Sequence, residues 1–261
     1  MTGTVELSID RLTIRFGGLT AVEGMSFAVR QGEILSLIGP NGAGKTSAFN
    51  AITGYIRPAA GSLSYRGTPL NGLKPHEIAA LGIVRTFQKT SVFAGLSVLD
   101  NVLIGMHLRS EQHPLAILAG ARSVAREEAA LVADAHATLR FIGLTTQAGR
   151  LASALPYGEL RLLEVAIALA AKPRLLLLDE PVCGLNPTET QSFMALIGRI
   201  RALGTTVLVV EHDMKMVMGV SDRIVCLNQG RIIADGAPAE IRGNAEVVRA
   251  YLGTAWEAAR S

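Results

Sequence analysis

The chain has 261 residues, of which 49% are hydrophobic and 18% are charged, and its formal net charge is +3. This composition excludes a disordered chain, and the length suits one domain with subdomains rather than two independent domains. The Lys and Arg residues are dispersed along the sequence, so the mild positive charge does not predict a nucleic-acid partner.

The first elements that the sequence predicts are β-strands. Apolar and polar residues alternate in VELSIDRLTIRF at 5–16 and in MSFAV at 25–29, as expected for antiparallel strands with one face in water. The run EILSLI at 33–38 is almost wholly apolar and predicts a buried strand. The chain therefore opens with β structure.

From residue 96 to residue 144 the pattern becomes helical. It is clearest at 126–143, where apolar residues form a stripe on one helix face and Gly143 is placed to cap the C-terminus. Two apolar strands follow, RLLLL at 174–178 and TTVLVV at 205–210, with a helical segment between them. Such strands are typical of a parallel sheet covered by helices on both faces, so we expect an α/β core.

No apolar run approaches the roughly 20 residues needed to span a bilayer, and the N-terminus lacks the apolar segment of an export signal. We therefore expect a chain that stays in the cytoplasm. The two cysteines, Cys183 and Cys226, are too few and too far apart for a disulfide framework or a zinc site, so we expect both to be reduced.

Residues 39–46 read GPNGAGKT and fit the phosphate-loop pattern G-x-x-x-x-G-K-[ST]. The motif follows a predicted strand and opens a helix, where backbone N–H groups and the positive helix end can surround phosphates. We expect Lys45 to reach the β- and γ-phosphates of ATP and Thr46 to bind Mg²⁺. The predicted nucleotide-binding residues of this loop are Gly39, Asn41, Gly42, Ala43, Gly44, Lys45, Thr46 and Ser47.

Two acidic residues, Asp179 and Glu180, end the strand that LLLL begins at 175–178. Carboxylates at the C-terminal edge of such a strand lie where α/β sheets bind ligands. Asp179 suits Mg²⁺, usually through a water molecule, and Glu180 is placed to polarise the attacking water as a general base. His212 ends the next core strand and should lie at the same edge, where it would contact the γ-phosphate and the catalytic water; a packed core imidazole is the alternative.

The order of these motifs resembles that of an ATP-binding cassette ATPase over nearly the whole chain. The matching motifs are the phosphate loop, Gln88 in RTFQKT, LPYGE at 155–159, LLLLDEP at 175–181, GLNP at 184–187 and EHD at 211–213. The resemblance implies a P-loop NTPase core with a RecA-like parallel sheet and flanking helices. It also implies an N-terminal antiparallel β subdomain at about 1–35 and 60–70, and a helical subdomain with the signature loop at about 89–165.

The same resemblance assigns roles to further residues. Phe16 matches the aromatic residue that stacks on adenine, although it could be an ordinary core residue of its strand. Gln88 matches the residue that senses Mg²⁺ and the transmembrane partner, and it joins Thr46 and Asp179 in the expected Mg²⁺ site. LPYGE stands at the place of the signature loop, which in this family completes the site of a second cassette in a head-to-tail dimer. The signature residues expected at that nucleotide are Pro156, Tyr157, Gly158 and Glu159, with the N–H of Gly158 aimed at the γ-phosphate from a helix that starts near Glu159.

Two places depart from the usual family pattern. Pro156 and Tyr157 stand where Ser and Gly are usual, and Asn186 stands where the following loop usually has Asp. A degenerate site is one interpretation. However, LPYGE together with GLNPTET, the long insert after Gln88 and the ending GNAEVVRAYLG is similar to the cassettes of branched-chain amino-acid importers.

This subgroup implies an ATPase that energises an importer of branched-chain or other hydrophobic amino acids, with a urea or amide importer as the alternative. The implied partners are a second cassette, in a heterodimer or a homodimer, two transmembrane permease subunits and, indirectly, an extracytoplasmic binding protein. The chain would then lie at the cytoplasmic face of the plasma membrane. The apolar stretch at 91–102 would help to dock the permease, or would only pack the insert onto the core.

Two functions of other classes stay open. A soluble cassette protein that acts on ribosomes or DNA would resemble paired cassettes or a cassette split by a coiled coil or a zinc insert, and none of these features is visible in the sequence. A nucleotide-dependent switch without turnover would not require Lys45, Glu180 and His212 together.

Overall fold

The computed structural model describes residues 3–86, 92–107 and 122–252. The chain divides into two compact units. The sheet unit comprises Met1–Arg85, Arg174–Cys183 and Thr190–Ser261, and the helical unit comprises Thr86–Pro173 and Gly184–Glu189. In the part of the chain that is described, no helix combines the length and the apolar character needed to cross a bilayer.

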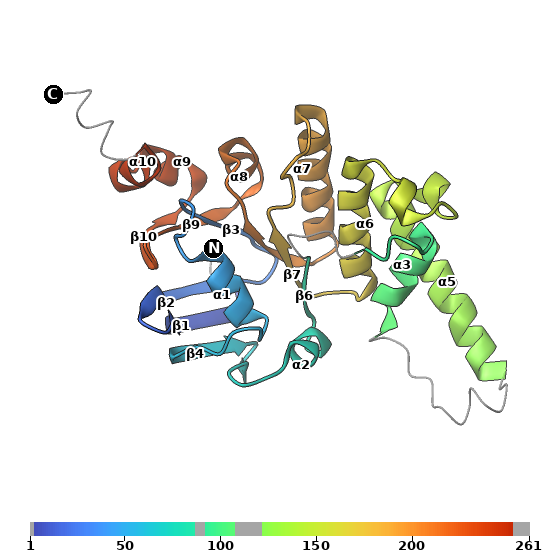
Figure 1. The fold of residues 1–261 in the computed structure, drawn as a ribbon, viewed down its shortest axis with the longest axis horizontal. Coiled ribbons are helices and arrows are strands. Elements are labelled where there is room, and N and C mark those ends of the chain that lie inside the picture. The colour runs from blue at the N-terminus through green and yellow to red at the C-terminus, as the bar shows by residue number, and fades with distance from the viewer. Residues whose placement is uncertain (1–2, 87–91, 108–121, 253–261) are drawn as a thin grey trace. The chain divides into compact units, whose positions relative to one another are not determined.

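The sheet unit opens with an antiparallel sheet, whose first two strands are drawn in blue in Figure 1. Its four strands follow the order β2-β1-β4-β5. Their bounds are β1 Val5–Phe16, β2 Leu19–Arg30, β4 Ala60–Tyr65 and β5 Thr68–Pro69. The pairing of β1 with β2 shifts register between Ile9 and Leu12, where Arg11 has a φ of 47°. Residues three apart in a regular strand would face opposite sides of the sheet, but this irregularity allows Ile9 and Leu12 both to be buried.

A second sheet of six strands forms the centre of the sheet unit, in the order β10-β9-β3-β8-β7-β6. Neighbouring strands are parallel except for β10 and β9. Their bounds are β3 Ile34–Ile38, β6 Ile83–Arg85, β7 Leu175–Asp179, β8 Thr206–Val210, β9 Arg223–Asn228 and β10 Arg231–Gly236. Strands β3, β7 and β8 are buried at every position, which explains their continuous apolar sequences and confirms the α/β class.

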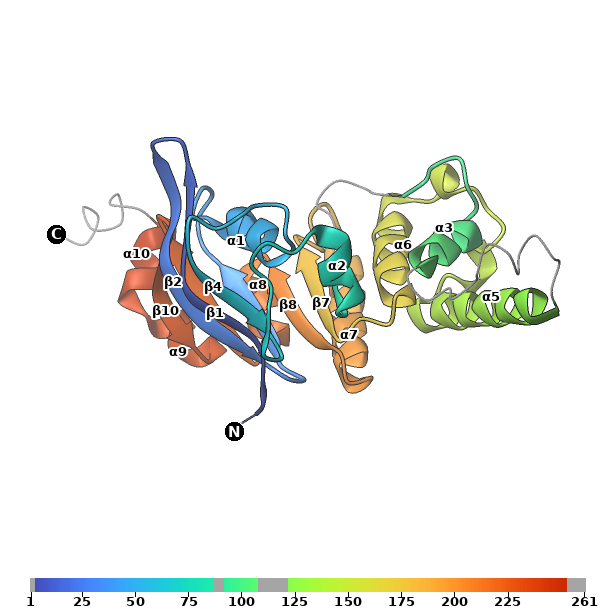
Figure 2. The same cartoon turned by 90° about the horizontal axis from the view of Figure 1, so that it is seen from below.

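Helices cover the sheets of this unit. Their bounds are α1 Lys45–Ile52, α2 Pro75–Ala80, α7 Pro187–Ala202, α8 Met214–Val220, α9 Pro238–Gly243 and α10 Ala245–Leu252; the first three residues of α7 belong to the helical unit. Phe49 of α1 lies in a core that also holds Ile14 of the antiparallel sheet and Leu177 of the parallel sheet. Figure 2 shows α9 and α10 beside β10, which both helices contact.

Among its described residues, the helical unit contains three main helices that pack on one another. Their bounds are α3 Val98–Gly105, α5 Arg122–Ile142 and α6 Tyr157–Ala170, and two short 3₁₀ helices span Thr145–Gln147 and Ala152–Ala154. Gly143 has a φ of 87°, and its N–H donates to the carbonyl oxygen of Leu139 at 3.0 Å. It therefore caps α5 as the sequence predicts.

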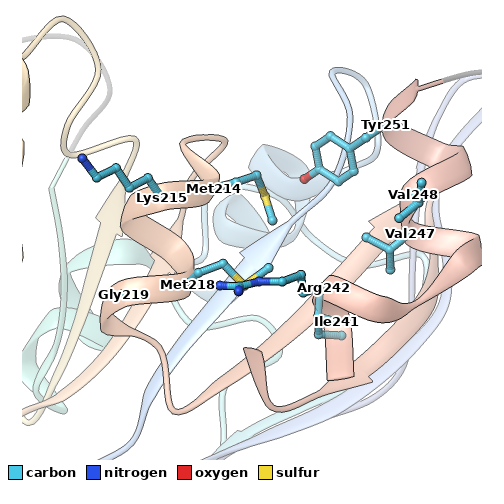
Figure 3. A pocket seen from close by; sticks show the side chains of 9 residues that line it. All are labelled: Met214, Lys215, Met218, Gly219, Ile241, Arg242, Val247, Val248 and Tyr251. Carbon is cyan, nitrogen blue, oxygen red and sulfur yellow. The ribbon is translucent and has the colours of Figure 1, made fainter. Parts of the chain in front are cut away.

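Helices α8, α9 and α10 border an apolar groove of about 590 Å³. Figure 3 shows Met214 and Met218 of α8 on one side of this groove and Val247 and Tyr251 of α10 on the other. Burial raises the pKa of the Tyr251 hydroxyl to about 12.

Candidate functional site

The predicted phosphate loop joins the end of β3 to the start of α1. Gly39 has a φ of 150°, and a side chain there would overlap the carbonyl oxygen of Leu227. Gly44 has a φ of 104°, and its added Cβ would lie 2.6 Å from the carbonyl oxygen of Ala21. Both glycines are therefore required by the backbone and by close neighbours. The carbonyl oxygen of Ala43 accepts from the N–H of Gly230 at 3.0 Å, which braces the loop against the turn between β9 and β10.

Lys45 folds back onto this loop. Its ammonium donates to the carbonyl oxygens of Gly39 at 2.7 Å and Pro40 at 3.0 Å. Burial lowers the pKa of Lys45, while the carboxylates of Glu180 and Asp179 act in the opposite direction. The structure therefore brings Lys45 within electrostatic range of both predicted acidic residues. Of the other predicted loop residues, those that reach the surface at least in part are Asn41, Gly42, Thr46 and Ser47.

Asp179 and Glu180 stand at the C-terminal end of β7, as the sequence predicts. Glu180 adopts a left-handed backbone with a φ of 47°, which is strained for a residue with a side chain. Its N–H donates to the carbonyl oxygen of Val210 at 2.9 Å, and its own carbonyl accepts from the N–H of Cys183 at 3.2 Å. These bonds hold the chain reversal directly beyond Asp179, and strain of this kind is common at functional sites.

A buried ion pair holds Asp179, and sequence reasoning missed it. Arg85, the last residue of β6, donates from Nη2 to Oδ2 of Asp179 at 2.6 Å and from Nη1 to Oδ1 of Asn50 at 2.6 Å. The side chains of Arg85 and Asp179 are 7% and 1% exposed. The parallel pairing of β6 with β7 brings these two residues together, although 94 positions separate them in the sequence.

Glu211 is a second site residue that sequence reasoning missed. It is fully buried, and its Oε2 accepts from the N–H groups of His212 at 2.7 Å and Asp213 at 3.0 Å. Its Oε1 accepts from the N–H of Val182 at 3.1 Å, so one carboxylate joins the turn after Glu180 to the turn after β8. The His212 side chain itself is 54% exposed, so a packed core imidazole is the wrong alternative.

We expect Glu211→Ala to lower the free energy of unfolding by about 3 kcal/mol, because one buried and two half-buried N–H groups lose a charged acceptor. Urea denaturation followed by circular dichroism measures this change. Glu246→Ala is the matched control, because Glu246 is exposed on α10 and its truncation should change stability by less than about 0.5 kcal/mol. Equal stabilities of the two variants would contradict the bracing role.

Two further residues that the sequence predicts at the nucleotide site are Phe16 and Gln88. Phe16 is the last residue of β1 and is 48% exposed, so it is a surface aromatic and not an ordinary core residue. Gln88 lies outside the described residues. In the described chain, no group of three or more His, Cys, Asp or Glu side chains is placed to hold a metal ion by itself. This is consistent with Mg²⁺, which is usually bound by one or two carboxylates together with water and substrate phosphates.

The signature-like segment belongs to the helical unit. Helix α6 begins at Tyr157 with Pro156 as its N-cap, two residues before the expected start near Glu159. A Cβ on Gly158 would lie 2.5 Å from Oε1 of Glu189, so this glycine leaves room for a neighbouring carboxylate. The hydroxyl of Tyr157 accepts from Nε of Arg161 at 3.0 Å. Gly158 and Tyr157 therefore have contacts within the helical unit that the sequence did not suggest.

Asn186 has a structural role at the start of α7. Its Oδ1 accepts from the N–H groups of Thr188 at 3.0 Å and Glu189 at 2.9 Å, and its own N–H donates to Oε2 of Glu189 at 2.8 Å. This reciprocal arrangement is a capping box, in which Asn and Asp are about equally effective. The departure from Asp at this position is therefore compatible with an intact loop.

The parallel sheet, the loop between β3 and α1 and the acidic residues that end β7 define a nucleotide-binding ATPase of the P-loop class. The family model described as "ABC transporter" matches residues 22–183. A further model, described as "Branched-chain amino acid ATP-binding cassette transporter", matches residues 231–257. The chain belongs to the ATP-binding cassette transporter family, and it is an ATPase.

Individual relatives are similar to this chain over almost its whole length. The high-affinity branched-chain amino acid transport ATP-binding protein LivG of Salmonella typhimurium is 45% identical over 250 residues, which cover 95% of this chain and 98% of that protein. A nucleotide-free ATP-binding cassette from an ABC transporter has a TM-score of 0.84 at 30% identity, with 96% of this chain and 100% of that chain covered. An ATP-binding cassette of an ABC transporter in its ADP conformation has the same TM-score, 0.84, and the same identity, 30%.

Proposed function

We propose that this chain is the ATP-hydrolysing subunit of a membrane importer for branched-chain or other hydrophobic amino acids. The observation that carries the proposal is the gathering of Lys45, Asp179 and Glu180 at one edge of the parallel sheet, in a chain 45% identical to a branched-chain amino acid transport protein. The family match at 231–257 supports the same subgroup. A urea or amide importer is the alternative substrate class.

In this proposal the phosphate loop binds ATP through its backbone N–H groups and through Lys45, which would exchange its two carbonyl partners for phosphate oxygens. Phe16 stacks on adenine. Thr46, Asp179 and Gln88 hold Mg²⁺, which would neutralise charge on the β- and γ-phosphates. The loop residues assigned to the nucleotide are Gly39, Asn41, Gly42, Ala43, Gly44, Lys45, Thr46 and Ser47.

Glu180 acts as the general base that removes a proton from the attacking water, because the strained turn after β7 fixes its backbone beside the metal-binding Asp179. His212 contacts the γ-phosphate and the same water. Glu211 supports both residues indirectly, since its carboxylate binds the N–H of His212 and the N–H of Val182, two residues beyond Glu180.

The signature segment Pro156, Tyr157, Gly158 and Glu159 would complete the nucleotide site of a second cassette, in a heterodimer or a homodimer. The positive end of α6 suits a γ-phosphate from that cassette. The chain would bind two transmembrane permease subunits at the cytoplasmic face of the plasma membrane and would serve an extracytoplasmic binding protein through them. Phe93 and Leu96 are exposed apolar residues of the helical unit and would contribute to the permease contact.

Gly158→Asp should leave nucleotide binding by the monomer intact and prevent ATP-dependent dimerisation, because a carboxylate would face phosphate and would also crowd Glu189. Analytical ultracentrifugation with ATP measures the dimer. Gly158→Ala separates the two effects, since its methyl group also crowds the Glu189 side chain but adds no charge. If Gly158→Asp dimerised as the wild type does, the signature segment would not lie at an interface.

The substrate class is tested with the importer reconstituted in proteoliposomes with its permeases and binding protein. Leucine, isoleucine or valine should raise the ATPase rate, whereas urea and acetamide should not. Stimulation by urea or acetamide alone would replace the amino-acid proposal with the alternative. If neither the amino acids nor the amides stimulated the ATPase, both proposed substrate classes would be wrong.

A further inference from the structure

The guanidinium of Arg85 lies at the meeting point of three elements of the sheet unit. Its own strand, β6, pairs with β7, which ends in Asp179. Its Nη2 donates to Asp179, and its Nη1 donates to Asn50 of α1 at 2.6 Å and more weakly to Thr53 at 3.4 Å. The guanidinium also lies over the ring of Phe49, 5.4 Å from its centroid. One side chain thus ties the end of β7 to the helix that follows the phosphate loop.

The ion pair between Arg85 and Asp179 is buried. Taking two charged side chains out of water is costly, and removal of one partner leaves an uncompensated buried charge. A planar guanidinium can hold two acceptors in fixed directions, whereas an ammonium acts as a point charge. Arg85 therefore fixes the direction of the Asp179 carboxylate relative to α1, whose second residue is Thr46.

We infer that Arg85 is a positioning residue for the Mg²⁺ site, which sets the Asp179 carboxylate at the distance from Thr46 that a shared Mg²⁺ requires. This inference rests on the proposed roles of Asp179 and Thr46 at Mg²⁺. Mg²⁺ demands nearly ideal octahedral geometry, so a small rotation of one carboxylate weakens its binding more than it weakens the binding of phosphate by backbone N–H groups. Residues outside the coordination sphere commonly contribute 10–100-fold to metal affinity in this way.

The test separates metal-dependent from metal-independent nucleotide binding in the full chain. The affinity for a fluorescent ADP analogue is titrated with excess Mg²⁺ and again with EDTA, and the ratio of the two affinities is the readout. We expect Arg85→Gln to reduce this ratio about 10-fold or more, with the affinity in EDTA changed less than about threefold. Arg85→Lys should restore part of the ratio, because it keeps the charge but not both directed bonds.

Two further variants serve as controls. Arg223→Gln breaks another largely buried ion pair of the same unit, that with Glu33, and should lower the melting temperature without changing the ratio. Asn50→Ala keeps the Arg85–Asp179 pair and removes one anchor of the guanidinium, so it should lower the ratio by a smaller factor. If Arg85→Gln does not fold, Asn50→Ala decides the question by itself.

The outcomes are distinguishable. A ratio that stays at the wild-type value in Arg85→Gln or, failing that, in Asn50→Ala would overturn the inference and leave the proposed function standing. Equal losses of affinity with Mg²⁺ and with EDTA would make Arg85 a structural residue and also overturn it. If the wild type itself showed no gain in affinity from Mg²⁺, the assignment of Mg²⁺ to Asp179 and Thr46 would fall, and the role of Arg85 with it.

Discussion

Glu180→Gln is expected to lower ATP turnover at least about 100-fold, the usual scale for the loss of a general base. ATP binding should persist, because the substitution keeps the size of the side chain and the backbone bonds of Glu180 to Val210 and Cys183. The variant should therefore accumulate as an ATP-bound dimer. Phosphate release measures turnover, and size-exclusion chromatography with ATP detects the dimer.

Glu246→Gln is the control for this experiment, because it removes one exposed carboxylate of the same unit and should leave turnover unchanged. A Glu180→Gln variant with near-normal turnover would refute the general-base role. A variant that bound no ATP would instead point to a structural role for Glu180 in the turn after β7.

Lys45→Ala should weaken nucleotide binding at least about 30-fold. Truncation of one partner of a buried charged contact costs roughly 2 kcal/mol or more of binding free energy. Because about 1.4 kcal/mol corresponds to a factor of ten in affinity, this cost predicts the loss of about 30-fold. Lys45→Ala removes the bond to the carbonyl oxygen of Gly39, but the loop should keep its shape, since Gly39 still lies against Leu227 and Gly44 against Ala21. Titration with a fluorescent ATP analogue gives the affinity.

Lys215→Ala controls for the loss of a positive charge, because Lys215 is exposed on α8 and lies outside the phosphate loop. Its affinity should equal that of the wild type. Retention of tight ATP binding by Lys45→Ala would show that the backbone alone holds the phosphates, and the predicted role of Lys45 would be wrong.

Local patterns explain why much of this molecule could be predicted from its sequence. The phosphate loop requires glycine where the backbone has a positive φ and lies close to its neighbours, as at Gly39 and Gly44. Glycines at this spacing can be recognised in the sequence. The central strands are buried on both faces, so their apolar runs at 175–178 and 206–210 identified them. Asn186, Pro187 and Glu189 also had a readable signal, because Asn, Pro and Glu in this spacing are typical of a helix start.

Contacts between distant segments could not be predicted in this way. Arg85 in IVRT reads as one charged residue at the end of a short strand, and only the pairing of β6 with β7 reveals its contact with Asp179. Glu211 reads as one acid in EHD, and its bond to Val182 depends on the pairing of β7 with β8. Gly158 lacked an evident local role because Glu189, which occupies the space beside it, is 31 positions away.

The importer assignment is tested by isolating the chain from gently solubilised host membranes with ATP present and identifying the proteins that co-purify in stoichiometric amounts. We expect two multi-span permease subunits together with a second ATP-binding cassette. Recovery of ribosomal or DNA-bound proteins, or of no membrane protein at all, would contradict the importer assignment and favour a soluble ATPase.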